Sequence, residues 1–166
     1  MANSLSTKGI ARKLKQSAAQ IKAATTFKVA SASTTANNTT TYADIAGLLV
    51  TVVPGTYKFR LVLPSTVASG TGGIKYCFKY TGTVLSTLES AAKGFTTAAV
   101  ANQRVTSTTD QADLFTQAAV VTQTEIEGVF VVTTGGTVKV QVAQNTANAS
   151  NTVALANGVF ELNQVA

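Results

Sequence analysis

Few residues of this chain are of a type that supports catalysis. The sequence contains no histidine and a single cysteine, Cys77, so a thiol nucleophile would lack the base that usually activates it. One cysteine cannot form an internal disulfide, and without histidine it cannot build a zinc site. We therefore expect neither nucleophilic catalysis nor a structural metal, and we interpret Cys77 as a free thiol on the polar face of a strand.

The acidic residues include two pairs whose spacing deserves a chemical test. Glu125 and Glu127 are two apart on an expected strand and share one face, and glycoside hydrolysis requires two carboxylates. They open the run "TEIEGVF", however, which is typical of a solvated strand face. Asp110 and Asp113 lie in a polar loop without EF-hand form, and "GTGG" at 70–73 lacks the lysine and helix of a phosphate-binding loop. We predict that the protein is not an enzyme and needs no cofactor or small-molecule substrate.

The strongest functional signal is the distribution of charge. The chain has 13 Lys+Arg against 7 Asp+Glu, and six of the basic residues precede the first acid, Asp44. Residues 1–28 thus carry +6, while 13 − 6 = 7 basic residues oppose 7 acidic ones in the remainder. A basic tail on a neutral body indicates a contact with something anionic.

The basic segment gains one apolar edge when it is placed on a helix. In "KGIARKLKQSAAQIKAA", at 8–24, the apolar residues recur at spacings of 4, 4 and 3, from Ile10 to Ile21. An isolated helix of this length is marginal in water, so we expect this arm, helical or extended, to become ordered only against a partner. A solvated tail without a partner is the alternative. The residues expected to bind are Lys8, Ile10, Arg12, Lys13, Leu14, Lys15, Ile21 and Lys22.

Composition divides the chain into three parts. Residues 1–30 form the basic arm, in which "TFKVA" at 26–30 is a candidate first strand. The polar, low-complexity run "SASTTANNTTT" at 31–41 predicts a linker, and residues 42–166 form the folded body. No apolar run reaches the ~20 residues of a membrane-spanning helix, and no signal peptide is recognisable, so we expect synthesis in the cytoplasm.

Three turn signals predict three hairpins in the body. Pro54-Gly55, Gly135-Gly136 and Asn157-Gly158 each separate two runs of alternating apolar and polar residues. The resulting registers would place apolar side chains opposite one another: Val52 and Tyr57, Val50 and Phe59, Leu48 and Leu61; Val131 and Val140, Val129 and Val142; Leu155 and Phe160, Val153 and Leu162.

The remaining segments complete an all-β prediction. "STLESAAKG" is a candidate short helix, because Ser86 and Glu89 have capping-box spacing and Gly94 follows as a stop. The strand at 128–134 is apolar on both faces, so we expect Phe130 and Val132 to face a neighbouring subunit. Roughly eight to ten strands are expected, which predicts a jelly-roll-like β-sandwich.

Several runs of the body resemble segments of tailed-phage structural proteins. These runs are "YADIAGLLVTVVPGTYKFRLVL", "GGIKYCFKYTGT" and the closing "IEGVFVVTTGGTVKVQVAQNTANASNTVALANGVFELNQV". They are similar to head-decoration and fibre domains of trimeric jelly-roll type over roughly residues 42–166. The resemblance implies a homotrimer in which sheets of three subunits meet on the axis. The basic arm has no counterpart in that pattern.

Together, the arm and the resemblance predict a capsid decoration (cement) protein. Such a trimer would bind the major capsid protein on the outer surface of a phage head, become part of the virion and stabilise the shell. One alternative is a capsid shell protein whose arm binds nucleic acid; the regular apolar residues of the arm and its few aromatic residues disfavour that partner. Another is a head or tail fibre domain that binds the host surface. We expect no membrane partner.

Overall fold

The computed structural model describes residues 25–81, 84–96 and 99–165, whose regular elements are all β-strands. Within these ranges there is no helix long and apolar enough to cross a membrane. The strands are β1 (Thr25–Val29), β2 (Thr34–Ala36), β3 (Ala43–Val52), β4 (Gly55–Val67), β5 (Ile74–Thr81), β6 (Val84–Thr96), β7 (Val100–Ser107), β8 (Gln111–Gln117), β9 (Val121–Thr134), β10 (Gly136–Ala143), β11 (Thr152–Ala154) and β12 (Val159–Gln164).

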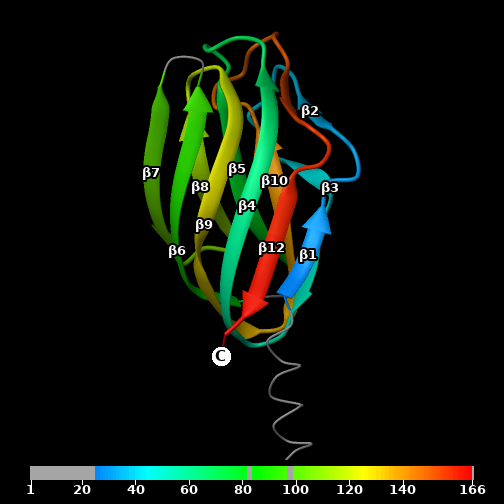
Figure 1. Cartoon of the computed structure of the whole chain (residues 1–166), viewed down its shortest axis with the longest axis vertical. Helices are drawn as coiled ribbons and strands as arrows, with labels where there is room; N and C mark the ends of the chain where they lie inside the picture. Colours follow the sequence, from blue (N-terminus) through cyan, green and yellow to red (C-terminus); the bar gives the residue numbers. More distant parts are fainter. Residues whose placement is uncertain (1–24, 82–83, 97–98, 166) are drawn as a thin grey trace, which may run out of the picture.

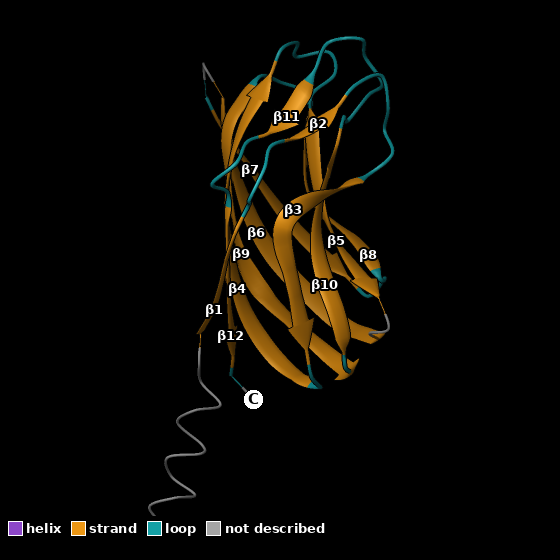
Figure 2. Cartoon of the chain, turned by 90° about the vertical axis from the view of Figure 1, so that its right-hand side faces the viewer, coloured by secondary structure: helices purple, strands orange, loops and turns teal. Residues whose placement is uncertain are grey.

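Two antiparallel sheets pack face to face, which confirms the predicted all-β sandwich (Figures 1 and 2). The larger sheet has the order β1-β12-β4-β9-β6-β7, with β11 also paired to β4 and β2 paired to β11. The smaller sheet has the order β3-β10-β5-β8. Figure 2 shows the two layers edge-on, with most of the long loops gathered at one end, which we call the upper end.

The strand pairs from β3 to β10 are nested around one hairpin. β6 pairs with β7, β5 with β8, β4 with β9, and β3 with β10, each pair antiparallel. The eight strands therefore form one long double-stranded ribbon. This ribbon folds over between the two sheets, so that its pairs alternate from the smaller sheet to the larger one.

The predicted hairpins at Pro54-Gly55 and Gly135-Gly136 are wrong, although both turns lie where the signals placed them. Val52 pairs with Gly136 in the smaller sheet, and Gly55 pairs with Val132 in the larger one. The two turns therefore lie side by side at one corner of the sandwich. At this corner both strands of the ribbon cross from one sheet to the other. A Cβ on Gly135 would lie 3.1 Å from the Val52 carbonyl oxygen, so the corner packs closely. Each turn moves the chain to the other sheet instead of back along the same one.

The apolar faces predicted from the Pro54-Gly55 turn are correct despite the wrong pairing. The six side chains that the first turn was expected to bring together are all buried in the core: Leu48, Val50, Val52, Tyr57, Phe59 and Leu61. They meet across the interior of the sandwich, because β3 and β4 belong to facing sheets. Side-chain alternation specifies which face is buried, and this holds whichever strand becomes the neighbour.

The predicted hairpin at Asn157-Gly158 is also wrong. β11 and β12 both pair with β4, so they lie end to end along it. Ala154 opposes Ser65 and Val159 opposes Val62, so residues 155–158 lie opposite only 63–64 and form a bulge that is hydrogen-bonded to Ala30. Asn157 takes φ = 67°, as expected for this turn signal, whereas Gly158 is not among the positive-φ glycines of the described chain.

The candidate helix at 86–94 is a strand, β6, between β9 and β7. Its residues alternate, with Leu88, Ser90, Ala92 and Gly94 buried and the residues between them exposed. Gly94 is required by close packing: a Cβ there would lie 2.3 Å from Cζ of Phe115. Thirteen residues of cross-strand hydrogen bonding outweigh the good helix propensity of leucine, glutamate, alanine and lysine in this run.

The predicted domain boundaries need correction, because residues 25–41 belong to the sandwich. β1 pairs with β12 from Thr25 to Val29, which confirms a first strand in this region. β2 pairs with β11. The expected linker is tied down by hydrogen bonds from the Asn38 backbone to Asn148 and from the Thr39 backbone N–H to the buried Gln144 side chain.

Candidate functional site

The arm residues expected to bind a partner all lie outside the described residues. They are Lys8, Ile10, Arg12, Lys13, Leu14, Lys15, Ile21 and Lys22. The first described residue, Thr25, opposes Asn163 near the end of β12. The arm is therefore covalently joined to an ordered edge strand of the larger sheet, beside the end of the last strand.

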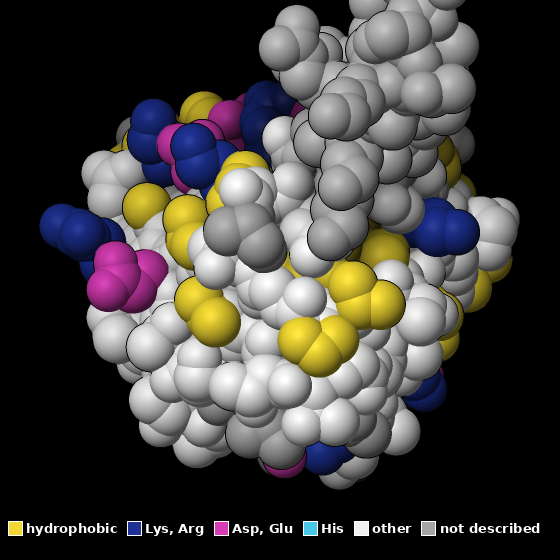
Figure 3. Space-filling model, turned by 90° about the horizontal axis from the view of Figure 1, so that it is seen from below, with side chains coloured by type: hydrophobic (Ala, Val, Ile, Leu, Met, Phe, Trp, Pro, Cys, Tyr) yellow, Lys and Arg dark blue, Asp and Glu magenta, His cyan; other side chains and the backbone are white. Residues whose placement is uncertain are grey.

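The lower end of the sandwich, from which β1 begins, carries exposed apolar side chains. Val53, in the β3–β4 corner, is 56% exposed, and Val165, after β12, is 47% exposed. The Tyr57 hydroxyl donates to the Val53 carbonyl oxygen at 2.8 Å, and the Val165 backbone N–H donates to Thr56, which holds both segments in place. Figure 3 shows hydrophobic side chains grouped across this end, with charged ones at the rim.

Phe130 and Val132, expected at a subunit interface, point instead into the core of the same chain. Both are buried, and Phe130 stacks on Tyr57 with ring centroids 5.2 Å apart. Val129, which faces away from the core, is 37% exposed. The expectation reversed the two faces of β9, because it oriented them by the hairpin at Gly135-Gly136 that does not form.

The outer face of the smaller sheet carries a polar row that includes the cysteine. Asp44, Gln141, Cys77 and Asp113 are successive cross-strand neighbours. Tyr42 donates a hydrogen bond from its hydroxyl to Asp113 at 2.6 Å. Cys77 lies on this polar face as predicted, but it is buried, with its Sγ 3.4 Å from the Gln141 side-chain oxygen.

Two groups of this row, Cys77 and Asp44, have shifted pKa values. Burial, together with the neighbouring Asp113 carboxylate, raises the pKa of the Cys77 thiol to about 12. Partial burial pushes the pKa of Asp44 upward, but hydrogen bonds from Lys139 and Gln141 and the lysine charge outweigh it, so the pKa is lowered. Lys139 contacts the Asp44 carboxylate at 2.7 Å. The row is a structural network in which the thiol is protonated at neutral pH and therefore unreactive.

The outer face of the larger sheet gathers most of the remaining charge. All four glutamates of the chain lie there, together with four basic residues. They alternate in sign across neighbouring strands, as in the row Glu161, Arg60, Glu127. The set is Lys58, Arg60, Glu89, Lys93, Arg104, Glu125, Glu127 and Glu161. Glu125 and Glu127 do face outward together, as the sequence predicted.

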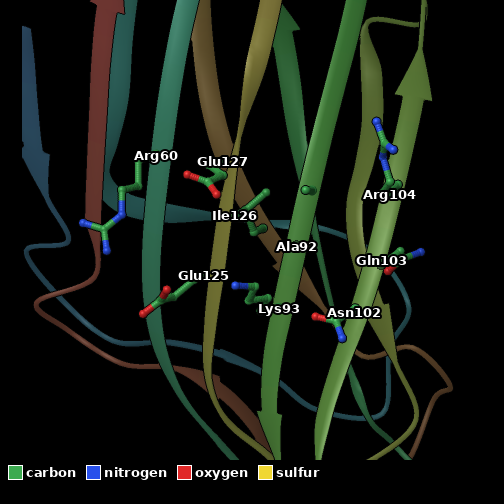
Figure 4. Close-up of a pocket in the computed structure, with 10 residues that line it drawn as sticks. Arg60, Ala92, Lys93, Asn102, Gln103, Arg104, Glu125, Ile126 and Glu127 are labelled. Carbon is green, nitrogen blue, oxygen red and sulfur yellow. The ribbon is translucent and has the colours of Figure 1, made fainter.

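A hollow crosses this charged face over strand β6. Its volume is about 340 Å³, and its walls include Lys93, Arg104, Glu125 and Glu127. In Figure 4, Glu127 and Arg104 stand on opposite sides of β6, on strands β9 and β7. The floor is Ala91, which opposes Glu127 on one side and Arg104 on the other. A short side chain between two long charged ones creates the hollow.

Sequence reasoning missed this hollow because its lining residues are scattered over four strands, β4, β6, β7 and β9. The only local signal was the pair Glu125 and Glu127, which indicates no more than a solvated face. The described residues contain no group of three or more histidine, cysteine, aspartate or glutamate side chains placed to hold a metal ion. No protein-family model matches this chain, and no curated protein sequence is significantly similar to it.

Proposed function

We propose that the protein is a non-enzymatic structural protein of a phage virion, a decoration protein that binds the outer surface of the head as a trimer. The observation that carries this proposal is the combination of features at the lower end of the sandwich. The basic arm joins the sandwich there, and the exposed side chains of Val53 and Val165 lie at the same end. One end of a rigid body thus offers both charge and apolar surface to a partner such as the major capsid protein.

The topology supports a jelly-roll body. Strands β3 to β10 form a single folded ribbon of nested antiparallel pairs, which is compatible with the two interleaved Greek keys of that fold. The resemblance of residues 42–166 to trimeric phage domains points the same way.

The proposed mechanism of stabilisation is avidity followed by linkage. Three arms on one rigid hub would convert weak contacts into tight binding, because each later contact is intramolecular. A ligand that binds only the assembled lattice stabilises it by mass action. In each arm, three buried apolar residues at about 1.5–3 kcal/mol apiece would outweigh screened ion pairs at ~0–1 kcal/mol. The charges would mainly govern association rate and orientation.

The test compares two full-length arm variants in a pull-down with undecorated capsids at two salt concentrations. Replacing Ile10, Leu14 and Ile21 with serine should abolish occupancy. Replacing the five basic residues Lys8, Arg12, Lys13, Lys15 and Lys22 with glutamine should weaken it less and remove its salt sensitivity. The opposite ranking would make the arm an electrostatic tether and would favour the alternative of a shell protein that binds nucleic acid.

The lower end is tested separately with matched valine substitutions. Val53→Ser should reduce capsid occupancy, whereas Val100→Ser, which changes a valine 49% exposed at the start of β7, should not. Light scattering of the purified protein tests the trimer, and a monomer at all concentrations would contradict the hub. If the protein bound host cells but not capsids, the fibre alternative would replace the proposal.

A further inference from the structure

Ala91 lies at the centre of a ring of four ionic side chains. Arg104 and Glu127 are its cross-strand neighbours. Lys93 and Glu89 lie two residues away along β6 and therefore share its outward face. Neighbouring strands are about 4.8 Å apart, and residues i and i+2 about 6.7 Å, so the ring spans the size of one or two sugar rings.

The ring is dipolar. Its cations, Lys93 and Arg104, occupy two adjoining sides, with Asn102 at the corner between them because it pairs with Lys93. Its anions, Glu127 and Glu89, occupy the other two sides. At the corner between these two anions lies Val129, which pairs with Glu89. A second hollow of about 390 Å³ shares Ala91, Arg104 and Glu127, so the depression continues along the strand.

These charged groups are not engaged with one another. Among the described residues, the one ion pair within 4.0 Å is that of Asp44 and Lys139, on the other sheet. In the same part of the chain, Lys93, Arg104 and Glu127 make no side-chain hydrogen bond, whereas Glu125 accepts one from Gln123 at 3.0 Å. Their donors and acceptors are therefore free to bind a ligand.

The ring selects among ligand chemistries. A guanidinium binds a carboxylate through two parallel hydrogen bonds, and the Lys93 ammonium reinforces it. Glutamate carboxylates only accept hydrogen bonds, so the opposite wall suits hydroxyl donors. The Ala91 methyl group and Val129 offer apolar contact to the C–H face of a sugar ring. Because the four ring charges sum to zero, a polyphosphate chain would meet as much repulsion as attraction.

We propose that this hollow binds a carboxylated oligosaccharide. The sugar carboxylate lies between Lys93 and Arg104, and sugar hydroxyls donate hydrogen bonds to Glu127 and Glu89. The sugar ring itself packs over the Ala91 methyl group. The site is on the side of the sandwich, and its function does not depend on the arm or on the proposed capsid contact.

The test is binding of the full-length protein to an immobilised set of carboxylated oligosaccharides, containing uronic or sialic acids, beside their methyl esters and neutral glycans. The wild-type protein should bind carboxylated members and not their esters. Ala91→Leu fills the hollow without changing charge, and Arg104→Gln removes the guanidinium; each should weaken binding about tenfold or more. The matched controls are Ala46→Leu and Lys79→Gln, both on the smaller sheet, and they should bind normally.

The basic arm could adsorb anionic glycans by itself, so a further variant separates the two contributions. The full-length chain in which the five basic arm residues are glutamine should retain carboxylate-dependent binding. Three results would each overturn the proposal: no binding to any carboxylated glycan, equal binding of the methyl esters, or unchanged binding by Ala91→Leu. Loss of binding in the arm variant alone would likewise assign the interaction to the arm.

Discussion

Replacing Phe130 with alanine removes a side chain at the centre of the aromatic core. The Phe130 ring is fully buried, and its centroid lies 5.2 Å from that of Tyr57 and 5.9 Å from those of Phe59, Phe78 and Tyr80. A buried phenylalanine truncated to alanine costs about 3–5 kcal/mol, because a cavity remains. Domains of this kind are stable by roughly 5–15 kcal/mol, so a large fraction of the free energy of unfolding should be lost.

Urea denaturation followed by circular dichroism, at two protein concentrations tenfold apart, measures this loss. Phe130→Leu serves as a milder variant that keeps the protein folded, with an expected cost below that of alanine. Val129→Ala, one residue away on the exposed face, is the control and should cost less than about 1 kcal/mol. If Phe130→Ala dissociated an oligomer while leaving the protomer's unfolding free energy unchanged, Phe130 would belong to an interface and the core assignment would be refuted.

Three further predictions concern the sheet edge, the cysteine and the ion pair. Deleting residues 1–24 should leave the melting temperature within a few degrees, whereas deleting 1–29 removes β1 and should lower it clearly; equal effects in calorimetry would contradict the pairing of β1 with β12. Cys77 should react slowly with a disulfide reagent in the native protein and faster after Tyr42→Ala, since Tyr42 is hydrogen-bonded to Asp113, the cross-strand neighbour of Cys77; immediate native reaction would show that the thiol is accessible. Because the pKa of Asp44 is lowered by folding, its ion pair stabilises the protein above the unfolded-state pKa of ~3.9, and this is lost as pH falls through the folded-state value. Stability of Asp44→Asn should therefore fall less on acidification than that of wild type, and parallel curves would refute the argument.

The fold class was predictable because side-chain alternation is a local property. Every apolar residue expected on an inward face of β3 and β4 is buried. The strand neighbours were not predictable, because a Pro-Gly or Gly-Gly pair reverses the chain equally well within one sheet or between two. At the corner where Val52 meets Gly136, the choice depends on a partner about eighty residues away in the sequence.

The candidate helix failed for a related reason. The run from Ser86 to Gly94 contains several good helix formers, but its conformation is decided by β9 on one side and β7 on the other. Capping-box spacing is meaningful only when an apolar helical edge follows. In this run, the period-two pattern of Leu88, Ser90 and Ala92 was the better indicator.

One candidate functional surface, the basic arm, can be recognised from the amino-acid sequence. The other, the hollow over Ala91, can be recognised only once the strand pairing is known. The charge of the arm is visible in the sequence, although its contacts stay a prediction. The hollow over Ala91 requires the register of three strands, since Glu127 and Arg104 become its walls only through β9 and β7. An alanine in a strand carries no sign of what surrounds it.

The pairing of β1 with β12 has a consequence for the order of events during synthesis. β1 is synthesised before its hydrogen-bonded neighbour, residues 159–163, which lies far along the chain. This seam of the sheet can therefore close only after residues 159–163 have been made. A chain that stops before Val159 keeps its basic segment but has no strand to fix the base of that segment to the sandwich. The position of β1, and with it the point where the basic segment joins the sandwich, is therefore fixed only once β12 is in place.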